Sequence, residues 1–87
     1  MVSSAIERTV LDFLTGDLFY DKDLSGLRET DSLAEREILD SLAILRIVTF
    51  CEETFGVEIP DTDVVPENFD SVRAISQLIE RHVPKNT

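Results

Sequence analysis

An acidic residue and a serine, Asp40 and Ser41, stand where a long polar stretch changes into a strongly apolar one. Residues 38–48 read Ile-Leu-Asp-Ser-Leu-Ala-Ile-Leu-Arg-Ile-Val, and aspartate is a preferred residue at the cap that precedes a helix. If Asp40 is the cap, Ser41 is the first helical residue and its hydroxyl points outward. The first turn of a helix has unpaired N–H groups and a partial positive charge. A phosphate on Ser41 would therefore be electrostatically stabilised.

Apolar residues recur at helical spacing and predict an all-α fold. We expect a small antiparallel four-helix bundle, with three main helices, one short helix and a long first loop. The expected elements are helices over 4–15, 41–55 and 71–82, and a short helical turn over 61–65. Gly16 and Gly56 are expected to end the first two helices. Over residues 16–40, Leu24, Leu27 and Leu33 can pin the loop to the core.

Within the second helix, one apolar stripe is expected to face the core. Its members are Ile44, Ile47 or Val48, Cys51 and Phe55. Leu42 and Leu45 fall to one side of this stripe and are expected to be partly exposed. In the last helix the apolar set is Val72, Ile75, Leu78, Ile79 and Val83.

Length and charge restrict the class of protein. The 87 residues suit a single domain, 1–87, with a frayed tail at 84–87. The net charge of −10 disfavours binding to nucleic acid or to anionic membranes, and it suits basic protein partners. No apolar run approaches a membrane span, and residues 1–7 lack the pattern of a signal peptide. The single cysteine excludes an internal disulfide. We expect a monomeric, cytoplasmic protein.

The Asp-Ser pair alone is weak evidence, because it occurs three times, at Asp31-Ser32, Asp40-Ser41 and Asp70-Ser71. Such pairs most often serve as helix caps or turns. We interpret Ser32 and Ser71 in this way. Ser41 alone opens a long apolar helix, and that helix leads into the sequence Phe55-Gly-Val-Glu-Ile-Pro-Asp61.

With these motifs in place, the chain resembles the acyl and peptidyl carrier proteins from about Leu33 to His82. The family pattern is Asp-Ser-Leu at the start of helix two, a helix ending in Phe, then Glu-Ile-Pro-Asp, and Phe-x-Ser/Thr-Val before the last helix. Here these motifs are residues 40–42, Phe55, 58–61 and 69–72. The chain looks most like the free-standing carriers of specialised-metabolite pathways, such as polyketide, nonribosomal peptide and antibiotic biosynthesis.

The resemblance implies a carrier and not an enzyme. Ser41 would receive a 4′-phosphopantetheine arm from coenzyme A, and Asp40 would cap the helix and help recognition. The arm would be added by a phosphopantetheinyl transferase that binds the magnesium itself. The arm's thiol would hold intermediates as thioesters. A ligase, adenylation enzyme or acyltransferase would load them, and synthases or tailoring enzymes would take them on. The implied partner-binding residues are Leu42, Leu45, Arg46, Thr49, Glu53, Val64 and Val65.

Two residues depart from the family pattern. Glu37 stands where many relatives have a glycine, and Arg46 stands where fatty-acid carriers usually have an acid. The second departure favours a dedicated partner.

Two other functions remain open. One is an acidic helical interaction module without a prosthetic group. The other is a calcium loop that begins at Asp21, although its twelfth position is Ser32 and not the usual glutamate. Cys51 is interpreted as a core residue and His82 as a helix-end residue. No metal site is expected.

Overall fold

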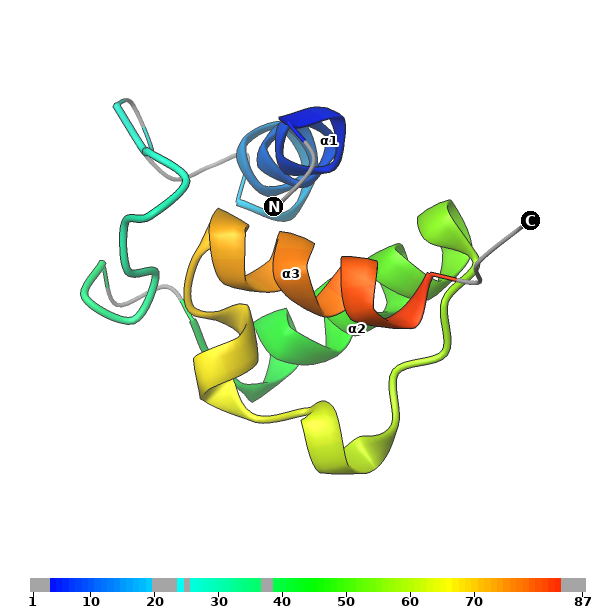
Figure 1. Ribbon diagram of the computed structural model, residues 1–87. Helices are drawn as coiled ribbons and strands as arrows, with labels where there is room; N and C mark the ends of the chain where they lie inside the picture. The colour runs from blue at the N-terminus through cyan, green and yellow to red at the C-terminus, as the bar shows by residue number, and fades with distance from the viewer. Residues whose placement is uncertain (1–3, 20–23, 25, 37–38, 84–87) are drawn as a thin grey trace.

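The three apolar stripes form three α-helices in the computed structural model, which describes residues 4–19, 24, 26–36 and 39–83. The helices are α1 (Ser4–Phe13), α2 (Ser41–Phe55) and α3 (Val72–His82), and α1 packs against α3 (Figure 1). No strand occurs among these residues, so the all-α prediction is confirmed. Four helices and antiparallel packing stay predictions. No helix in the described ranges is long and apolar enough to cross a membrane.

A 3₁₀ turn at Asp61–Asp63 confirms the short helical turn expected over 61–65, although it ends before Val64, and a second 3₁₀ turn at Pro66–Phe69 follows that was not predicted. Val64 and Val65 therefore lie between the two turns and not on a helix. The reason is local, because Pro66 disfavours helical geometry in the residue before it. Val65 is extended accordingly, with φ −128° and ψ 150°.

The core collects side chains from every segment, including the first connection. Leu24, Leu27 and Leu33 are buried, which confirms that they pin this connection to the core. On α2 the most buried residues are Ala43, Ile47 and Cys51, whereas Ile44, Val48 and Phe55 are only partly buried. The buried face of α2 is therefore rotated toward Ala43, compared with the stripe that the sequence predicts. Val83 is the cap that follows α3, and it is 37% exposed, whereas Val72, Ile75, Leu78 and Ile79 are buried.

Asp70 fastens the first connection to the entry of α3. Its carboxylate accepts hydrogen bonds from the Ser32 hydroxyl at 2.8 Å and from the Ala34 N–H at 2.8 Å. Its carbonyl oxygen accepts from the Leu33 N–H at 2.6 Å. We call this set of contacts the Asp70 clasp. A separate ion pair joins α3 to α1, because Arg73 Nε lies 2.9 Å from Glu7 Oε2.

The first helix does not end at Gly16 as expected. It continues beyond α1 as a π-helical turn over Leu14–Leu18, and the Phe19 N–H donates to the Leu14 carbonyl at 2.9 Å. Gly16 lacks the positive φ that a glycine helix end requires. Leu14 and Phe19 are both buried, and their burial favours continuing the helix through the glycine.

Gly56 ends α2 as predicted, in the left-handed region with φ 67°. Its N–H donates to the Glu52 carbonyl at 3.1 Å. The tail 84–87 and Glu37 lie outside the described residues, as do Asp21 and Asp23 of the suggested calcium loop.

The two helix glycines should respond oppositely to alanine. Gly56→Ala should lower the free energy of unfolding by about 1 kcal/mol, because a Cβ is strained at positive φ. Gly16→Ala should raise it by about 0.5–1 kcal/mol, because the turn is helical and no atom lies within 4 Å of the added Cβ. Urea denaturation of both variants measures this. Equal effects at the two positions would contradict the assigned backbone conformations.

Candidate functional site

Asp40 and Ser41 form the start of α2 as predicted. Asp40 is extended, with φ −130°, and its Oδ1 accepts a hydrogen bond from the Ala43 N–H at 2.8 Å. The helix proper starts at Ser41, and the Ile44 N–H donates to the Asp40 carbonyl at 2.9 Å. Asp40 is therefore the helix cap, and Ser41 occupies the first helical position.

The Ser41 side chain is exposed and makes no hydrogen bond with any residue that the structure describes. No acidic residue lies in the first turn of α2. The partial positive charge of the helix start is thus offset only by the Asp40 cap. An exposed hydroxyl at such a position fits a covalently attached phosphate, which would lie beside free backbone N–H groups.

The other two Asp-Ser serines have structural roles. Ser32 Oγ donates to Asp70 and also accepts from the Glu35 N–H at 3.2 Å. Ser71 Oγ caps α3 by accepting from the Ala74 N–H at 3.0 Å. Both hydroxyls are occupied, as expected from their interpretation as turn and cap residues. Of the three serines, only Ser41 presents a hydroxyl without a partner in the described structure.

Most of the residues that the resemblance assigned to partner binding lie on the exposed side of α2. Leu42 is 65% exposed and Leu45 is 58% exposed, which is unusual for large apolar side chains. Arg46, Thr49 and Glu53 are exposed as well.

Val64 and Val65, which the resemblance also assigned to partner binding, differ in their exposure. Val64 is half-buried against the core, whereas Val65 is 36% exposed. Asn68 Nδ2 donates a hydrogen bond to the Asp63 carbonyl at 2.8 Å, which links the two ends of the segment that contains both valines. These residues are placed by the 3₁₀ turns and not by a helix.

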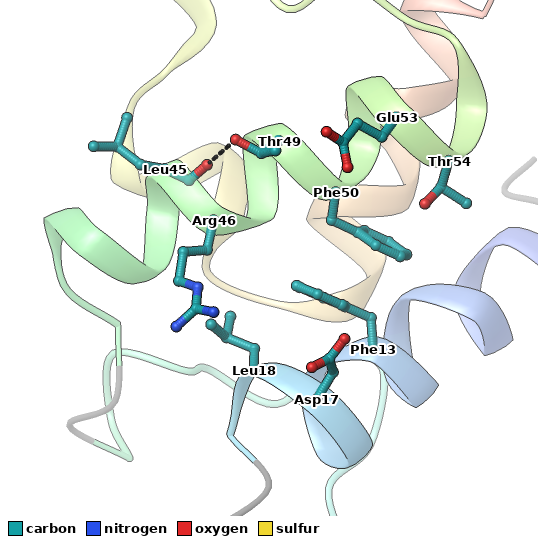
Figure 2. Close-up of a pocket in the computed structure, with 9 residues that line it drawn as sticks. All are labelled: Phe13, Asp17, Leu18, Leu45, Arg46, Thr49, Phe50, Glu53 and Thr54. Atoms are coloured by element: carbon teal, nitrogen blue, oxygen red, sulfur yellow. Dashed lines mark hydrogen bonds between the residues drawn. The ribbon is translucent and has the colours of Figure 1, made fainter.

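A surface pocket of about 360 Å³ lies between α1 with its π turn and α2 (Figure 2). We call it the α1–α2 pocket. Of the residues implied to bind partners, it includes Leu45, Arg46, Thr49 and Glu53 but not Leu42, Val64 or Val65. It also includes five residues that sequence reasoning missed: Phe13, Asp17, Leu18, Phe50 and Thr54. The Phe13 and Phe50 rings stack on each other in its wall, with centroids 4.0 Å apart and planes 11° apart. No local sequence signal links these two rings, because they meet only through tertiary packing.

Cys51 lies in the core, and His82 contacts an acidic side chain at the end of α3. Cys51 is completely buried, and burial, with a smaller effect of the Glu52 charge, raises the pKa of its thiol to about 12. It is a core residue, as predicted. His82 lies in the last turn of α3, and its Nε2 is 2.8 Å from Asp63 Oδ2, a contact that the sequence did not predict. The described residues contain no group of three or more His, Cys, Asp or Glu side chains that could hold a metal ion.

Comparison with known proteins gives the family. The model of the phosphopantetheine attachment site family matches residues 20–79, a range that contains all three Asp-Ser pairs. The chain is also similar to proteins named D-alanyl carrier protein from Streptococcus pyogenes serotypes M5 (strain Manfredo), M49 (strain NZ131) and M1. Each is 28% identical over 76 residues, which cover 87% of this chain and 92% of the relative. No solved structure gives a significant match.

The family domain carries a covalently attached 4′-phosphopantetheine, and its members act as shuttles for other enzymes without catalysing a reaction themselves. The fold and the helix start described above suit this group. By the match over 20–79, the chain belongs to the phosphopantetheine-binding carrier proteins.

Proposed function

We propose that Ser41 is the attachment residue and that the chain carries acyl or aminoacyl groups between biosynthetic enzymes. The observation that carries this proposal is the unpartnered Ser41 hydroxyl at the start of α2, set against the occupied hydroxyls of Ser32 and Ser71. Attachment at Ser32 would break the Asp70 clasp, and attachment at Ser71 would remove the cap of α3. Attachment at Ser41 disrupts no hydrogen bond in the described structure.

The attachment reaction is a phosphoryl transfer inside a separate phosphopantetheinyl transferase, which binds the magnesium ion. Ser41 Oγ loses its proton and forms a bond to the β-phosphorus of coenzyme A. The pyrophosphate P–O bond breaks, and adenosine 3′,5′-bisphosphate leaves. When bound, the arm supplies a terminal thiol that holds cargo as a thioester. Asp40 keeps the helix start in place and forms part of the surface that the transferase recognises.

The exposed face of α2 supplies the surface for the other enzymes. Leu42 and Leu45 offer apolar contact area, whereas Arg46, Thr49 and Glu53 offer polar contacts. Val64 and Val65 flank the arm. The partners are a loading ligase, adenylation enzyme or acyltransferase, and then a synthase or tailoring enzyme.

The similarity to D-alanyl carrier proteins supports an aminoacyl cargo within this proposal. The pathway is a specialised one of polyketide, nonribosomal peptide or antibiotic type. The resemblance to free-standing carriers and the Arg46 departure support this choice. The chain acts as one monomeric cytoplasmic domain, 1–87. It folds as an antiparallel four-helix bundle in which the two 3₁₀ turns take the place of the short helix.

Modification should depend on Ser41 alone. With coenzyme A, magnesium and a broad-specificity phosphopantetheinyl transferase, the wild-type chain should gain the mass of one phosphopantetheine, and Ser41→Ala should gain none. Ser32→Ala and Ser71→Ala should still gain it, although each should lose about 1 kcal/mol or more of stability. Intact-protein mass and urea denaturation measure both effects.

Ser41→Ala should remain folded, because the Ser41 hydroxyl makes no hydrogen bond in the described structure. A gain of mass in this variant would show that Ser32 or Ser71 is the true site. No gain in folded wild type would favour the second candidate, an acidic helical interaction module without a prosthetic group. The exposed Leu42 and Leu45 would also suit that function.

Cys51 should not compete with the arm for cargo. Burial raises the pKa of the Cys51 thiol from 9.0 to about 12, so the thiol stays protonated at pH 8. Folded protein at pH 8 should therefore resist alkylation by iodoacetamide, which reacts with the thiolate. Protein in urea should be alkylated readily. The same shift means that stability falls as pH rises above 9, where the unfolded thiol ionises and the folded one does not. Rapid alkylation of folded protein would contradict the burial of Cys51.

A further inference from the structure

The 61–65 segment, which runs from Asp61 to Val65, has little apolar contact with the rest of the protein. It connects α2 to the entry of α3 and lies at the edge of the fold, outside the three α-helices (Figure 1). Its 3₁₀ turn contains no buried residue, and of its two valines only Val64 packs against the core. Apolar burial therefore contributes little to fixing the position of this segment.

Most hydrogen bonds of the 61–65 segment are local. The Asp63 N–H donates to the Pro60 carbonyl at 2.9 Å, and the Val64 N–H donates to the Asp61 carbonyl at 3.1 Å. Asn68 Nδ2 donates to the Asp63 carbonyl from the following turn. These bonds give the segment its shape, but none of them joins it to an α-helix.

Among the residues that the structure describes, one side-chain hydrogen bond joins the segment to a helix. His82 Nε2, in the last turn of α3, lies 2.8 Å from Asp63 Oδ2. The two residues are 19 positions apart, and both side chains are partly buried. Because water reaches them only in part, the contact is less weakened by solvent than a fully exposed pair would be. We call this contact the His82–Asp63 tie.

The other acidic residues near His82 do not replace Asp63. Glu52 and Glu58 line a surface pocket together with His82. However, Glu52 accepts a hydrogen bond from the Ile59 N–H at 3.3 Å, and Glu58 is exposed. Within the described structure, Asp63 is thus the one carboxylate at hydrogen-bond distance from the imidazole.

The chemistry of the pair assigns the donor. An ionised carboxylate only accepts hydrogen bonds, so His82 Nε2 carries the hydrogen and donates it to Asp63. The neutral imidazole with its hydrogen on Nε2 can do this, and so can the protonated imidazole. The tie therefore requires a side-chain N–H at position 82 and does not require a positive charge there.

We propose that His82 is a positioning residue for the 61–65 segment. By holding Asp63 against α3, it sets where Val64 and Val65 are presented, because both valines follow Asp63 directly and the Val65 N–H donates to the Asp63 carbonyl at 2.9 Å. The role of the two valines toward partner enzymes rests on the carrier function proposed above, whereas the tie itself does not.

Solvent exchange of the Val64 and Val65 amide hydrogens tests the tie directly, in ¹⁵N-labelled, unmodified full-length protein. His82→Leu keeps an apolar side chain at the end of α3 but has no donor, so it should speed exchange of both amides about fivefold, as expected for the loss of one hydrogen bond. Asp63→Ala should have the same effect. The double variant should exchange no faster than either single variant, because both substitutions remove one contact.

Two further variants make the test specific. His82→Gln restores a side-chain N–H donor and should keep the exchange rates within about twofold of wild type. The matched control is Arg81→Leu, which changes an exposed residue in the same turn of α3 and should leave the rates unchanged. A dispersed amide spectrum checks that each variant is folded.

The consequence for partner binding is measured by the kinetics of phosphopantetheine attachment. His82→Leu should raise the KM of the transferase for the carrier about threefold and leave kcat unchanged, because the start of α2 with Ser41 is not altered. His82→Gln should restore the wild-type KM. A merely structural loss would instead lower the fraction of reactive protein, and the amide spectrum would show it.

Three exchange results would overturn the tie. They are unchanged exchange in His82→Leu, exchange in His82→Gln as fast as in His82→Leu, and an equal effect of Arg81→Leu. An unchanged KM beside faster exchange would overturn the role of the tie in partner binding. If the folded wild-type chain accepts no phosphopantetheine, the proposed carrier function fails, and the exchange rates still decide whether His82 positions the segment.

Discussion

The Asp70 carboxylate is the contact on which the arrangement of the first connection depends. It accepts hydrogen bonds from the Ser32 hydroxyl and the Ala34 N–H. The backbone carbonyl of Asp70 accepts a further one from the Leu33 N–H. Hydrogen bonds to a charged group contribute about 1.5–3 kcal/mol each, more than those between neutral groups. The clasp thus offsets part of the conformational entropy that is lost when residues 32–34 are ordered. It also occupies one of the three serines that sequence alone presents as candidates.

The start of α2 has a simpler construction. Asp40 satisfies the backbone N–H of Ala43, so the serine next to it is not needed as a cap. Ser71 shows the other arrangement, because there the serine itself caps the helix. Two similar Asp-Ser pairs thus differ by one residue in their position relative to the helix. That difference decides whether the hydroxyl is used by the fold or left exposed.

Much of this could be predicted from the sequence, because the relevant interactions are local. Asp40 as a cap, Gly56 as a helix end and the extent of α2 follow from residues close together in the chain. The expected end of α1 was wrong because burial of Leu14 and Phe19 outweighed the glycine signal at Gly16. The short helical turn expected over 61–65 covers only Asp61–Asp63, and the second 3₁₀ turn, Pro66–Phe69, was not predicted.

The remaining features depend on contacts between distant residues. Ser32 and Asp70 are 38 positions apart, and no periodicity links them. The same is true of Phe13 and Phe50, whose stacking forms the wall of the α1–α2 pocket. Sequence reasoning found part of the α2 side of that pocket, at Leu45, Arg46, Thr49 and Glu53, but not Phe50 and Thr54. It missed the α1 side, because the π turn that supplies Asp17 and Leu18 has no recognised sequence signature.

The central claim is that, of the serines in the three Asp-Ser pairs, the fold leaves only Ser41 with a hydroxyl available for the prosthetic group. The most direct measurement is tandem mass spectrometry of peptides from wild-type protein that has been produced together with a phosphopantetheinyl transferase. We predict that the arm lies on the peptide containing Ser41 and that the peptides containing Ser32 and Ser71 are unmodified. Finding the arm on either of the other two serines would contradict the account.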